Sequence, residues 1–281
     1  MFDFSKLHLA GDNNRNVWIR VKLSRTLKEF IKRHYELIKT DYGVPNSTLD
    51  GWLKQIRLPV VVWYGLPKSD TIQNPFEYFC LGKSSKLVKL PEEKSPELAF
   101  VIGAIIGDGS LPFTDRGTRR EYPVVFTNSV RDTIKLYNIC FRKLFGIAPR
   151  TYALKKKSIY YVSELKSKII YRFFTKIIGF PEGKKSKIIS FPPVVKTFNF
   201  SEKYALLKGL LLTDGGISGR KYSYCTSSIA LVRDITLLFS ELKIGNHVYR
   251  QKFKNGTEYF HISISVGDAN KILNAEVAQL G

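Results

Sequence analysis

One stretch of the sequence occurs twice, and this repetition constrains the fold more than any other feature. The first copy reads LAFVIGAIIGDG over residues 98–109, and the second reads YALLKGLLLTDG over residues 204–215. A constant offset of 106 residues superimposes the two copies and aligns Asp108 with Asp214. Internal repetition of this kind predicts a structure built from two paired halves.

Each copy is predicted to form a buried helix. The apolar run is long enough for about three helical turns, too short to cross a bilayer, and is closed by Asp-Gly, where glycine supplies a left-handed stop. Small residues recur four apart, Gly103 with Gly107 and Gly209 with Thr213. This spacing places them on one helix face, where two backbones can approach closely. We therefore expect the two helices to pack on each other.

The aspartates that end the two copies are expected to lie side by side. At the C-terminal ends of helices the dipoles add partial negative charge, and two adjacent carboxylates, Asp108 and Asp214, repel each other. A cation relieves this repulsion, and oxygen ligands of this kind favour magnesium or calcium. A divalent ion near two carboxylates can activate a water and stabilise a leaving oxygen of a phosphodiester.

The composition indicates a polyanionic partner. Lys and Arg number 45 against 24 Asp and Glu, a formal charge of +21, while 44% hydrophobic and 13% aromatic residues suffice for a folded core. Nucleic acid is the first candidate. The chain has no apolar stretch near 20 residues, no signal peptide and no basic amphipathic helix with an apolar anchor, which disfavours a membrane.

The three cysteines indicate the redox compartment. Cys80, Cys140 and Cys225 are widely spaced and lie among apolar or strand-forming neighbours. They fit buried thiols better than a zinc site or a disulfide framework. We therefore expect a reducing, cytoplasmic compartment.

The first ninety residues are predicted to form a small, mainly helical domain. A helix that follows Ser24 ends at Gly43, and a second begins near Pro45. Two helices joined by a turn with glycine match a helix-turn-helix, but they also form ordinary structural subdomains, and both interpretations stay open. The first would bring five polar residues near DNA: Asn46, Ser47, Lys54, Gln55 and Arg57. Residues 58–64 are predicted to form a strand, and residues 82–96 a linker.

The duplication extends beyond the repeated stretch. Each half is predicted as helix, hairpin, helix, hairpin, helix. The second helices span residues 131–145 and 233–242, the later hairpins join 150–154 to 159–163 and 247–253 to 259–266, and residues 166–178 form the third helix of the first half. In the last strand, residues 259–266, apolar and polar side chains alternate, so one face can pack on helices while the other offers hydrogen-bonding groups to a DNA groove.

At the repeated stretches the chain resembles the LAGLIDADG homing endonucleases. The family motif maps onto residues 101–109 and 207–215. Ile106 and Leu212 occupy the position of the first aspartate in the motif. The resemblance implies an α+β fold with a pseudo-twofold αββαββα repeat, a central pair of motif helices and an antiparallel sheet saddle. It implies two repeats, over 96–190 and 200–281. The domain over 1–90, which the predicted linker separates from them, has no counterpart in the resemblance.

The resemblance also implies an activity and its site. The activity is metal-dependent, site-specific cleavage of double-stranded DNA that leaves short 3′ overhangs, with Mg²⁺ as cofactor, Mn²⁺ as a substitute, and Ca²⁺ binding without supporting cleavage. The implied metal site comprises Asp108, Asp214, Gly107 and Thr213. Lys185, or else Lys184 or Lys187, is the implied basic residue, and Asn128, with Ser227 as its approximate counterpart, is the implied polar residue.

Twelve residues are expected to contact DNA: Arg116, Arg119, Arg120, Lys155, Lys156, Lys157, Arg220, Lys221, Arg250, Lys252, His261 and Ser263. We expect a monomer, with RNA as a further possible partner. The second half ends without a counterpart to Gly183-Lys-Lys-Ser, which predicts an asymmetric active site. The alternatives are a DNA-binding regulator that has lost cleavage and an RNA-splicing maturase of the same fold. An intein remnant is disfavoured, because the chain lacks the terminal residues that splicing requires.

Overall fold

The structure is a computed structural model that describes residues 2–7, 19–23, 25–55, 57–67, 76–81, 86–115, 120–155, 159–183, 185–253 and 256–277. Two compact units make up the chain. Unit 1 contains Pro91–Ser167 and Ile178–Gly281, and unit 2 contains Phe2–Leu90 and Lys168–Ile177. The predicted domains over 1–90, 96–190 and 200–281 remain a prediction, because a division into compact units does not show where each repeat begins and ends.

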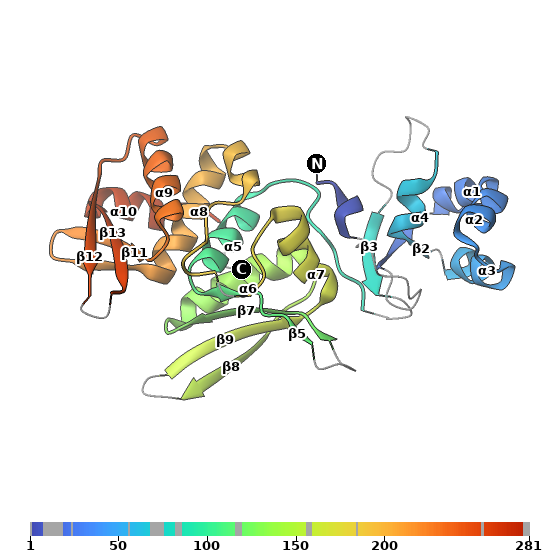
Figure 1. Cartoon of the computed structure of the whole chain (residues 1–281), viewed down its shortest axis with the longest axis horizontal. Coiled ribbons are helices and arrows are strands. Elements are labelled where there is room, and N and C mark those ends of the chain that lie inside the picture. Colours follow the sequence, from blue (N-terminus) through green and yellow to red (C-terminus); the bar gives the residue numbers. More distant parts are fainter. Residues whose placement is uncertain are drawn as a thin grey trace. The chain divides into compact units, whose positions relative to one another are not determined.

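Unit 1 contains two halves with the same order of elements (Figure 1). The first half consists of α5 (Pro96–Ile106), β4 (Gly109–Ser110), β7 (Pro123–Asn128), α6 (Arg131–Phe145), β8 (Arg150–Lys155) and β9 (Ile159–Lys166), with β5 (Thr114–Asp115) and β6 (Arg120–Glu121) paired between β4 and β7. The second half consists of α8 (Phe200–Asp214), β10 (Gly215–Ser218), β11 (Lys221–Thr226), α9 (Ile229–Glu241), β12 (Asn246–Lys252), β13 (Glu258–Ser265) and α10 (Val266–Leu273). A short 3₁₀ helix, η4 (Pro193–Thr197), precedes α8.

The two sheets of unit 1 have matching topology. Their strand orders are β4-β7-β9-β8 and β10-β11-β13-β12, and all neighbours are antiparallel. Each strand order places the hairpin that follows the motif helix beside the later hairpin. The predicted α+β fold with a duplicated αββαββα pattern is confirmed.

The two motif helices are well defined at their starts. Ser95 caps α5, since its side chain accepts a hydrogen bond from the Leu98 amide at 3.2 Å. Asn199 and Glu202 form a capping box at α8: Asn199 Oδ1 accepts from the Glu202 amide at 3.0 Å, and Glu202 Oε2 accepts from the Asn199 amide at 2.8 Å. These caps satisfy amides that have no partner within the helix. They fix where each apolar run begins.

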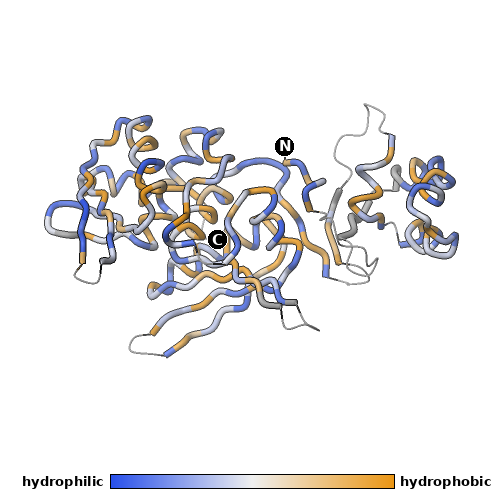
Figure 2. The backbone as a smooth tube through the Cα atoms, viewed as in Figure 1, coloured by the Kyte–Doolittle hydropathy of each residue, from blue (hydrophilic) through white to orange (hydrophobic). Residues whose placement is uncertain are grey.

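Helices α5 and α8 pack backbone against backbone, as the glycine spacing predicted. A Cβ added to Gly103 would lie 2.2 Å from the Leu206 carbonyl oxygen, and one added to Gly209 would lie 2.4 Å from the Phe100 carbonyl oxygen. No real side chain tolerates such distances, so both positions require glycine. All of α5 from Glu97 to Ile106 is buried, and the apolar colour runs through this pair in Figure 2.

Each sheet of unit 1 packs one face on helices. In the first half, Phe126 of β7 stacks on Tyr137 of α6 with ring centroids 4.3 Å apart. In the second half, Tyr224 of β11 and Ile262 of β13 are paired neighbours and both are almost fully buried. Because side chains alternate along a strand, the remaining side chains of both sheets form an open face.

Unit 2 combines short helices with a three-stranded sheet. It contains η1 (Phe4–Leu7), β1 (Ile19–Leu23), α1 (Arg25–Arg33), α2 (Tyr35–Tyr42), α3 (Asn46–Gln55), β2 (Arg57–Pro59), α4 (Val60–Gly65), β3 (Phe76–Leu81) and α7 (Lys168–Arg172), with sheet order β2-β1-β3. Helix α7 continues into a π-helix, η3 (Phe173–Ile178). Arg172 of α7 donates from Nη1 to the Leu7 carbonyl at 2.9 Å, which ties distant parts of the sequence together.

Two predictions for unit 2 need correction. The β-branched run over 58–64 is a strand only to Pro59, after which α4 begins. Val60, Val62 and Trp63 are buried in that helix, so tertiary burial overrides β propensity here. The helix that ends at Gly43 is divided at His34 into α1 and α2. The turn and α3 that follow match the predicted helix-turn-helix in outline, and its contact with DNA stays a prediction.

The described helices give no sign of a membrane span, because none has both the length and the apolarity to cross a bilayer.

We predict that Gly103→Ala destabilises the protein by about 1–3 kcal/mol, because the added methyl group would overlap the Leu206 carbonyl and force α5 from α8. The matched control is Gly51→Ala, also in a helix, where a Cβ meets nothing within 4 Å. Alanine is favoured over glycine in helices by up to about 1 kcal/mol, so the control should be neutral or stabilising. The melting temperatures of both variants are measured by calorimetry. Melting temperatures that changed in the same direction in both variants would contradict the close packing of α5 on α8.

Candidate functional site

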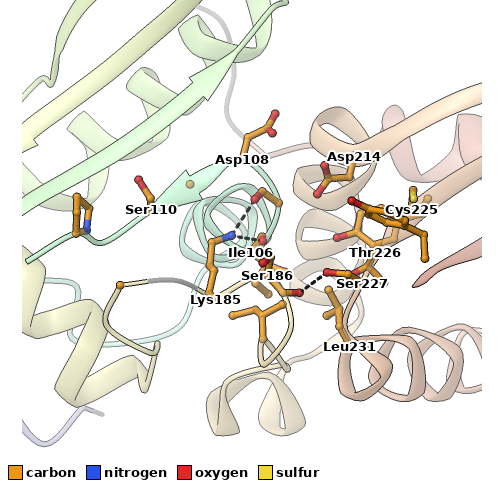
Figure 3. Close-up of a pocket in the computed structure, with 17 residues that line it drawn as sticks. Ile106, Asp108, Ser110, Lys185, Ser186, Asp214, Cys225, Thr226, Ser227 and Leu231 are labelled. Carbon is orange, nitrogen blue, oxygen red and sulfur yellow. Dashed lines mark hydrogen bonds between the residues drawn. The ribbon is translucent and has the colours of Figure 1, made fainter. Parts of the chain in front are cut away.

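The C-terminal ends of α5 and α8 open onto a cavity of about 580 Å³. Asp108, Asp214 and Lys185 line it together (Figure 3). Figure 3 shows the two aspartates at the same end of neighbouring helices, with Lys185 reaching toward the end of α5. The close packing of the motif helices is what brings these groups, distant in sequence, into one site.

Asp108 is oriented by a side chain from β7. Asn128, which is 5% exposed, donates from Nδ2 to Asp108 Oδ2 at 2.8 Å and to the Leu212 carbonyl at 3.3 Å. Its Oδ1 accepts from the Val130 amide at 2.8 Å. Because both ends of the amide are engaged, the orientation of Asn128 is fixed, and through it that of the carboxylate.

Asp214 lies across the helix pair from Gly107. A Cβ on Gly107 would stand 3.1 Å from Asp214 Oδ2 and 2.0 Å from Thr213 Oγ1, so glycine is required for the two helix ends to meet. The Thr213 hydroxyl bonds back onto its own helix, at 2.7 Å from the Leu210 carbonyl oxygen. Gly107 and Thr213 therefore face each other where the metal site was expected.

Lys185 caps the end of α5. Its ammonium donates to the Gly107 carbonyl at 2.8 Å and to the Ile106 carbonyl, which satisfies carbonyl groups with no partner within the helix. Burial lowers the pKa of Lys185 to about 8, while the negative charges of Asp214 and Asp108 oppose this shift. The side chain is thus mainly protonated at neutral pH and carries a positive charge into the cavity.

The segment that carries Lys185 is anchored to both halves. The Gly183 amide donates to the Leu111 carbonyl at 3.1 Å, and Ser227 Oγ donates to the Ser186 carbonyl at 2.9 Å. These bonds hold the segment in place where Lys185 enters the cavity, which Gly183 and Ser186 also line. Lys187 is exposed and does not line the cavity, and Lys184 lies outside the described residues.

The carboxylates resist ionisation. Burial and then the charge of Asp108 raise the pKa of Asp214 to about 6, against the opposing effects of Lys185 and of the Tyr224 hydroxyl. Burial also raises the pKa of Asp108, opposed by the Asn128 hydrogen bond and by Lys185. Asp214 is nevertheless open to solvent at the rim, so a ligand can reach it. A divalent cation would favour the charged forms of both groups.

The donor set fits a hard cation. Within the described residues, no cluster of three or more His, Cys, Asp or Glu side chains could hold a metal. The cavity instead offers two carboxylates and the Gly107 carbonyl, which already accepts from Lys185 and has a second lone pair. Oxygen donors without thiol or imidazole suit magnesium, manganese or calcium. Such an ion would need water or a substrate oxygen to complete its shell.

The structure corrects the proposed counterpart of Asn128. Phe126 pairs with Gly109 after the first motif, and Tyr224 pairs with Gly215 after the second. Counting two residues onward makes Thr226, not Ser227, the equivalent of Asn128. Its Oγ1 accepts the Ser228 amide at 3.2 Å, as Asn128 Oδ1 accepts an amide two residues on.

The sequence interpretation missed several residues of the cavity. Tyr224, Cys225 and Thr226 from β11 line it, together with Ser110 and Tyr259. The sequence did contain a signal for these residues. The strand β11 begins soon after the second motif and pairs with β10, which brings Tyr224 opposite Gly215 at the end of that motif. The missing information was the strand register, which decides which side chains face α8. Cys225 is a free thiol, half-buried, whereas Cys80 and Cys140 are buried as expected.

The open face of the second sheet is polar and aromatic. Strand alternation places His261 and Ser263 on the face opposite the buried Ile262, where His261 is partly exposed but Ser263, expected to contact DNA, is buried at 6% exposure. Tyr249 stacks on His261 with centroids 4.6 Å apart, and Gln251 Oε1 lies 2.9 Å from His261 Nε2. This face offers both stacking surfaces and hydrogen-bonding groups.

The residues expected to contact DNA do not all share that face. Arg250 pairs across the strands with Phe260, and Lys252 with Glu258, so strand alternation places both on the side of the sheet that carries Ile262, although both are exposed. Arg250 also forms an ion pair with Glu258. Arg250 and Lys252 therefore lie on the opposite face of the sheet from His261.

The other predicted contacts are exposed or lie outside the described residues. Lys155 on β8, Arg220 in the turn and Lys221 on β11 are exposed, and Arg120 lies in β6. The remaining four, Arg116, Arg119, Lys156 and Lys157, are outside the described residues.

Comparison with known proteins places this arrangement in a family. The LAGLIDADG-like domain matches residues 95–178 and 201–277, more than half of the chain. The chain belongs to this family. The homing endonuclease I-DmoI of Desulfurococcus mucosus is 22% identical over 171 residues, which span 59% of this chain and 80% of that protein.

Solved structures of I-DmoI have the same fold. One, of I-DmoI in complex with DNA and Ca, is 22% identical with a TM-score of 0.51, and the match covers 66% of this chain and 93% of that one. Another, from a study of mesophilic variants, is 22% identical with a TM-score of 0.50, and the match covers 65% and 98%. Residues 2–90 lie outside the family match.

We predict that Asp214→Asn raises the melting temperature at pH 7 in the presence of a chelator. The pKa of Asp214 is higher in the folded state, about 6, than its ordinary value of 3.8. Wild-type stability therefore falls as pH rises through this window, whereas asparagine has no charge to bury. The difference between variant and wild type should vanish below about pH 4.

Asp132→Asn is the control for this pH dependence. Lys135 holds the pKa of Asp132 below its ordinary value, so its removal should be neutral or destabilising at pH 7. Melting curves from pH 3 to 8 would refute the electrostatic account if Asp214→Asn lowered stability at every pH.

Proposed function

We propose that this chain is a site-specific endonuclease that cleaves double-stranded DNA in a divalent-metal-dependent reaction. The observation that carries the proposal is the pairing of Asp108 and Asp214 in one cavity with Lys185. Both carboxylates come from one chain, so a monomer suffices. The likeness to I-DmoI, a homing endonuclease, supports the same class of activity.

The charge of the chain supports DNA as the substrate. A formal charge of +21 favours a polyanion, and binding that releases condensed counterions would weaken steeply with salt. The open face of the second sheet, with His261 and Tyr249, has the groups that base edges in the major groove could bind. Long, specific sites follow from two such sheets in one chain.

The residues of the cavity have separable tasks. When bound, a divalent ion supplies Lewis-acid chemistry and lowers the pKa of water. Asp108 and Asp214 would hold that ion, and Asn128 fixes the orientation of Asp108. Lys185 brings a positive charge that can stabilise the negative charge developing on a phosphate. Together these groups suit phosphodiester hydrolysis. From the resemblance to the homing endonucleases, we propose that cleavage leaves short 3′ overhangs.

Retention of both carboxylates disfavours a regulator that has lost cleavage, because a binding protein gains nothing from two anions aimed at phosphates. An RNA-splicing maturase would use the same basic surfaces, so the binding assays below include RNA.

The function is tested by selecting cleaved sites from a randomised duplex library in magnesium. We expect wild type to cut a long site, and Asp108→Asn or Asp214→Asn to abolish cutting while binding to the selected duplex is retained or improved. Asparagine keeps the size but removes the charge that binds the metal and repels phosphates. Cleavage is read on end-labelled duplex, and affinity in calcium on the duplex and on RNA of the same sequence.

Two results would contradict this function. One is a wild-type protein that never cuts its tightest-bound duplex in magnesium or manganese, which would favour the regulator. The other is tighter binding to RNA than to DNA, which would favour the maturase.

We also predict that Lys185→Ala slows single-turnover cleavage by about 10²-fold or more, with a much smaller effect on affinity. A charge that acts mainly on the transition state changes the rate more than binding. Lys187→Ala is the control, because this exposed lysine does not line the cavity. Equal losses of rate and affinity in Lys185→Ala would make it an ordinary phosphate contact.

A further inference from the structure

The segment that carries Lys185 closes a tight turn. The amides of Ile188 and Ile189 donate to the Lys185 carbonyl at 2.9 and 2.8 Å. Ile189 is 3% exposed and lines the cavity, whereas Ile188 is exposed. The direction in which the Lys185 side chain leaves the backbone therefore depends on where this turn is held.

Ser228, the N-cap residue of α9, holds the other side of the turn. Its hydroxyl donates to the Ile189 carbonyl at 2.5 Å and accepts from the Leu231 amide at 3.3 Å. Ser228 is fully buried, so both bonds are shielded from water. Ile189 thus links the two residues, because its amide donates to Lys185 and its carbonyl accepts from Ser228.

Asp234 of α9 fixes the chain just beyond the turn. Its Oδ2 accepts from the Phe191 amide at 2.6 Å. The bond from the Ser227 hydroxyl to the Ser186 carbonyl lies on the other side of Ile189 along the chain (Figure 3). The beginning of α9 and the residue before its N-cap therefore hold residues 186–191 from both ends.

The fold of the repeat does not require these polar groups. The strand register that aligns the two halves makes Val130, the N-cap residue of α6, the counterpart of Ser228. It likewise places Leu136 at the position of Asp234. Val130 forms no side-chain capping bond, and neither apolar side chain can hold a backbone group by a hydrogen bond. The second half alone has polar side chains at these two positions, and both bond to the segment.

We propose that Ser228 and Asp234 are positioning residues for Lys185, through which the second half places a lysine at the end of the first motif helix. This role rests on the proposed function. Neither side chain lines the cavity, so both act through the turn that they hold. Loss of either contact lets the turn shift. A displaced ammonium stabilises the transition state less, so cleavage slows although no group expected to contact DNA is lost.

The first test separates the seating of the segment from the capping of α9. Glycine is itself a favourable N-cap residue, so Ser228→Gly largely keeps the helix start and removes the hydroxyl that donates to Ile189. We expect single-turnover cleavage to slow about tenfold or more, with unchanged affinity for the selected duplex in calcium. Ser95→Gly is the matched control, because Ser95 caps α5 at the end away from the cavity. It should keep the wild-type rate.

The second test compares two changes at Asp234. Asparagine keeps an oxygen that can accept from the Phe191 amide, whereas alanine has none. We expect Asp234→Ala to slow cleavage and Asp234→Asn to keep most of the wild-type rate.

A double-mutant cycle shows whether the effect passes through the lysine. In a Lys185→Ala background, Ser228→Gly and Asp234→Ala should slow cleavage no further, because the group that they position is already absent. A general loss of structure would lower the rate in both backgrounds.

Competitive labelling reports the state of the lysine without any cleavage. Reductive methylation modifies accessible amines, and peptide mass spectrometry compares Lys185 with the exposed Lys187. In wild type the Lys185 ammonium donates to the Ile106 and Gly107 carbonyls and should react slowly. We expect Lys185 to react several-fold faster in Ser228→Gly, with Lys187 unchanged.

The outcomes separate this role from the proposed function. Wild-type cleavage and wild-type labelling in Ser228→Gly and Asp234→Ala would overturn the positioning role and leave the proposed function intact. A rate loss that persists in the Lys185→Ala background would reduce both residues to supports of the fold. If wild type cuts no duplex, the proposed function fails, and the labelling alone then decides whether these residues hold Lys185.

Discussion

The close approach of α5 and α8 is the interaction on which unit 1 depends. Gly103 and Gly209 let the carbonyl groups of one helix lie where side chains of the other would otherwise stand. Without that contact the two halves would pack through side chains and the helices would lie farther apart. The sheets on either side take their positions from helices that pack on this pair. The spacing of two backbones thus sets the geometry of the whole duplicated unit.

The same contact creates the electrostatic problem at the helix ends. Bringing Asp108 and Asp214 together removes water from both, which raises the pKa of each carboxyl group, and the charge of Asp108 raises the pKa of Asp214 further. Lys185 offsets part of this cost from a segment anchored to both halves. The site is therefore held in an unfavourable charge state by packing energy gained along the full length of the helices. Sites of this kind favour a ligand of opposite charge.

The sequence sufficed for features that depend on local pattern. The repeated motif predicted the helix pair, both aspartates and the order of helices and hairpins, because periodicity and glycine spacing are direct consequences of backbone geometry. It did not suffice where distant contacts decide. The Val60–Trp63 run became helical through burial, Arg250 alternated away from His261 through strand register, and Tyr224 joined the cavity because β11 folds back onto Gly215. None of these is visible in a window of neighbouring residues.

The route of the chain between the two units limits how the N-terminal region can be removed. Residues 168–177 continue directly from β9 of unit 1, yet they belong to unit 2, where Phe173 and Phe174 are fully buried and Arg172 bonds to Leu7. The predicted third helix of the first repeat therefore lies mostly in the core of unit 2. A piece that ended at residue 90 could not be removed as an independent cassette, because it would leave an apolar helix without cover. The core of unit 2 therefore includes residues 168–177 as well as the N-terminal region.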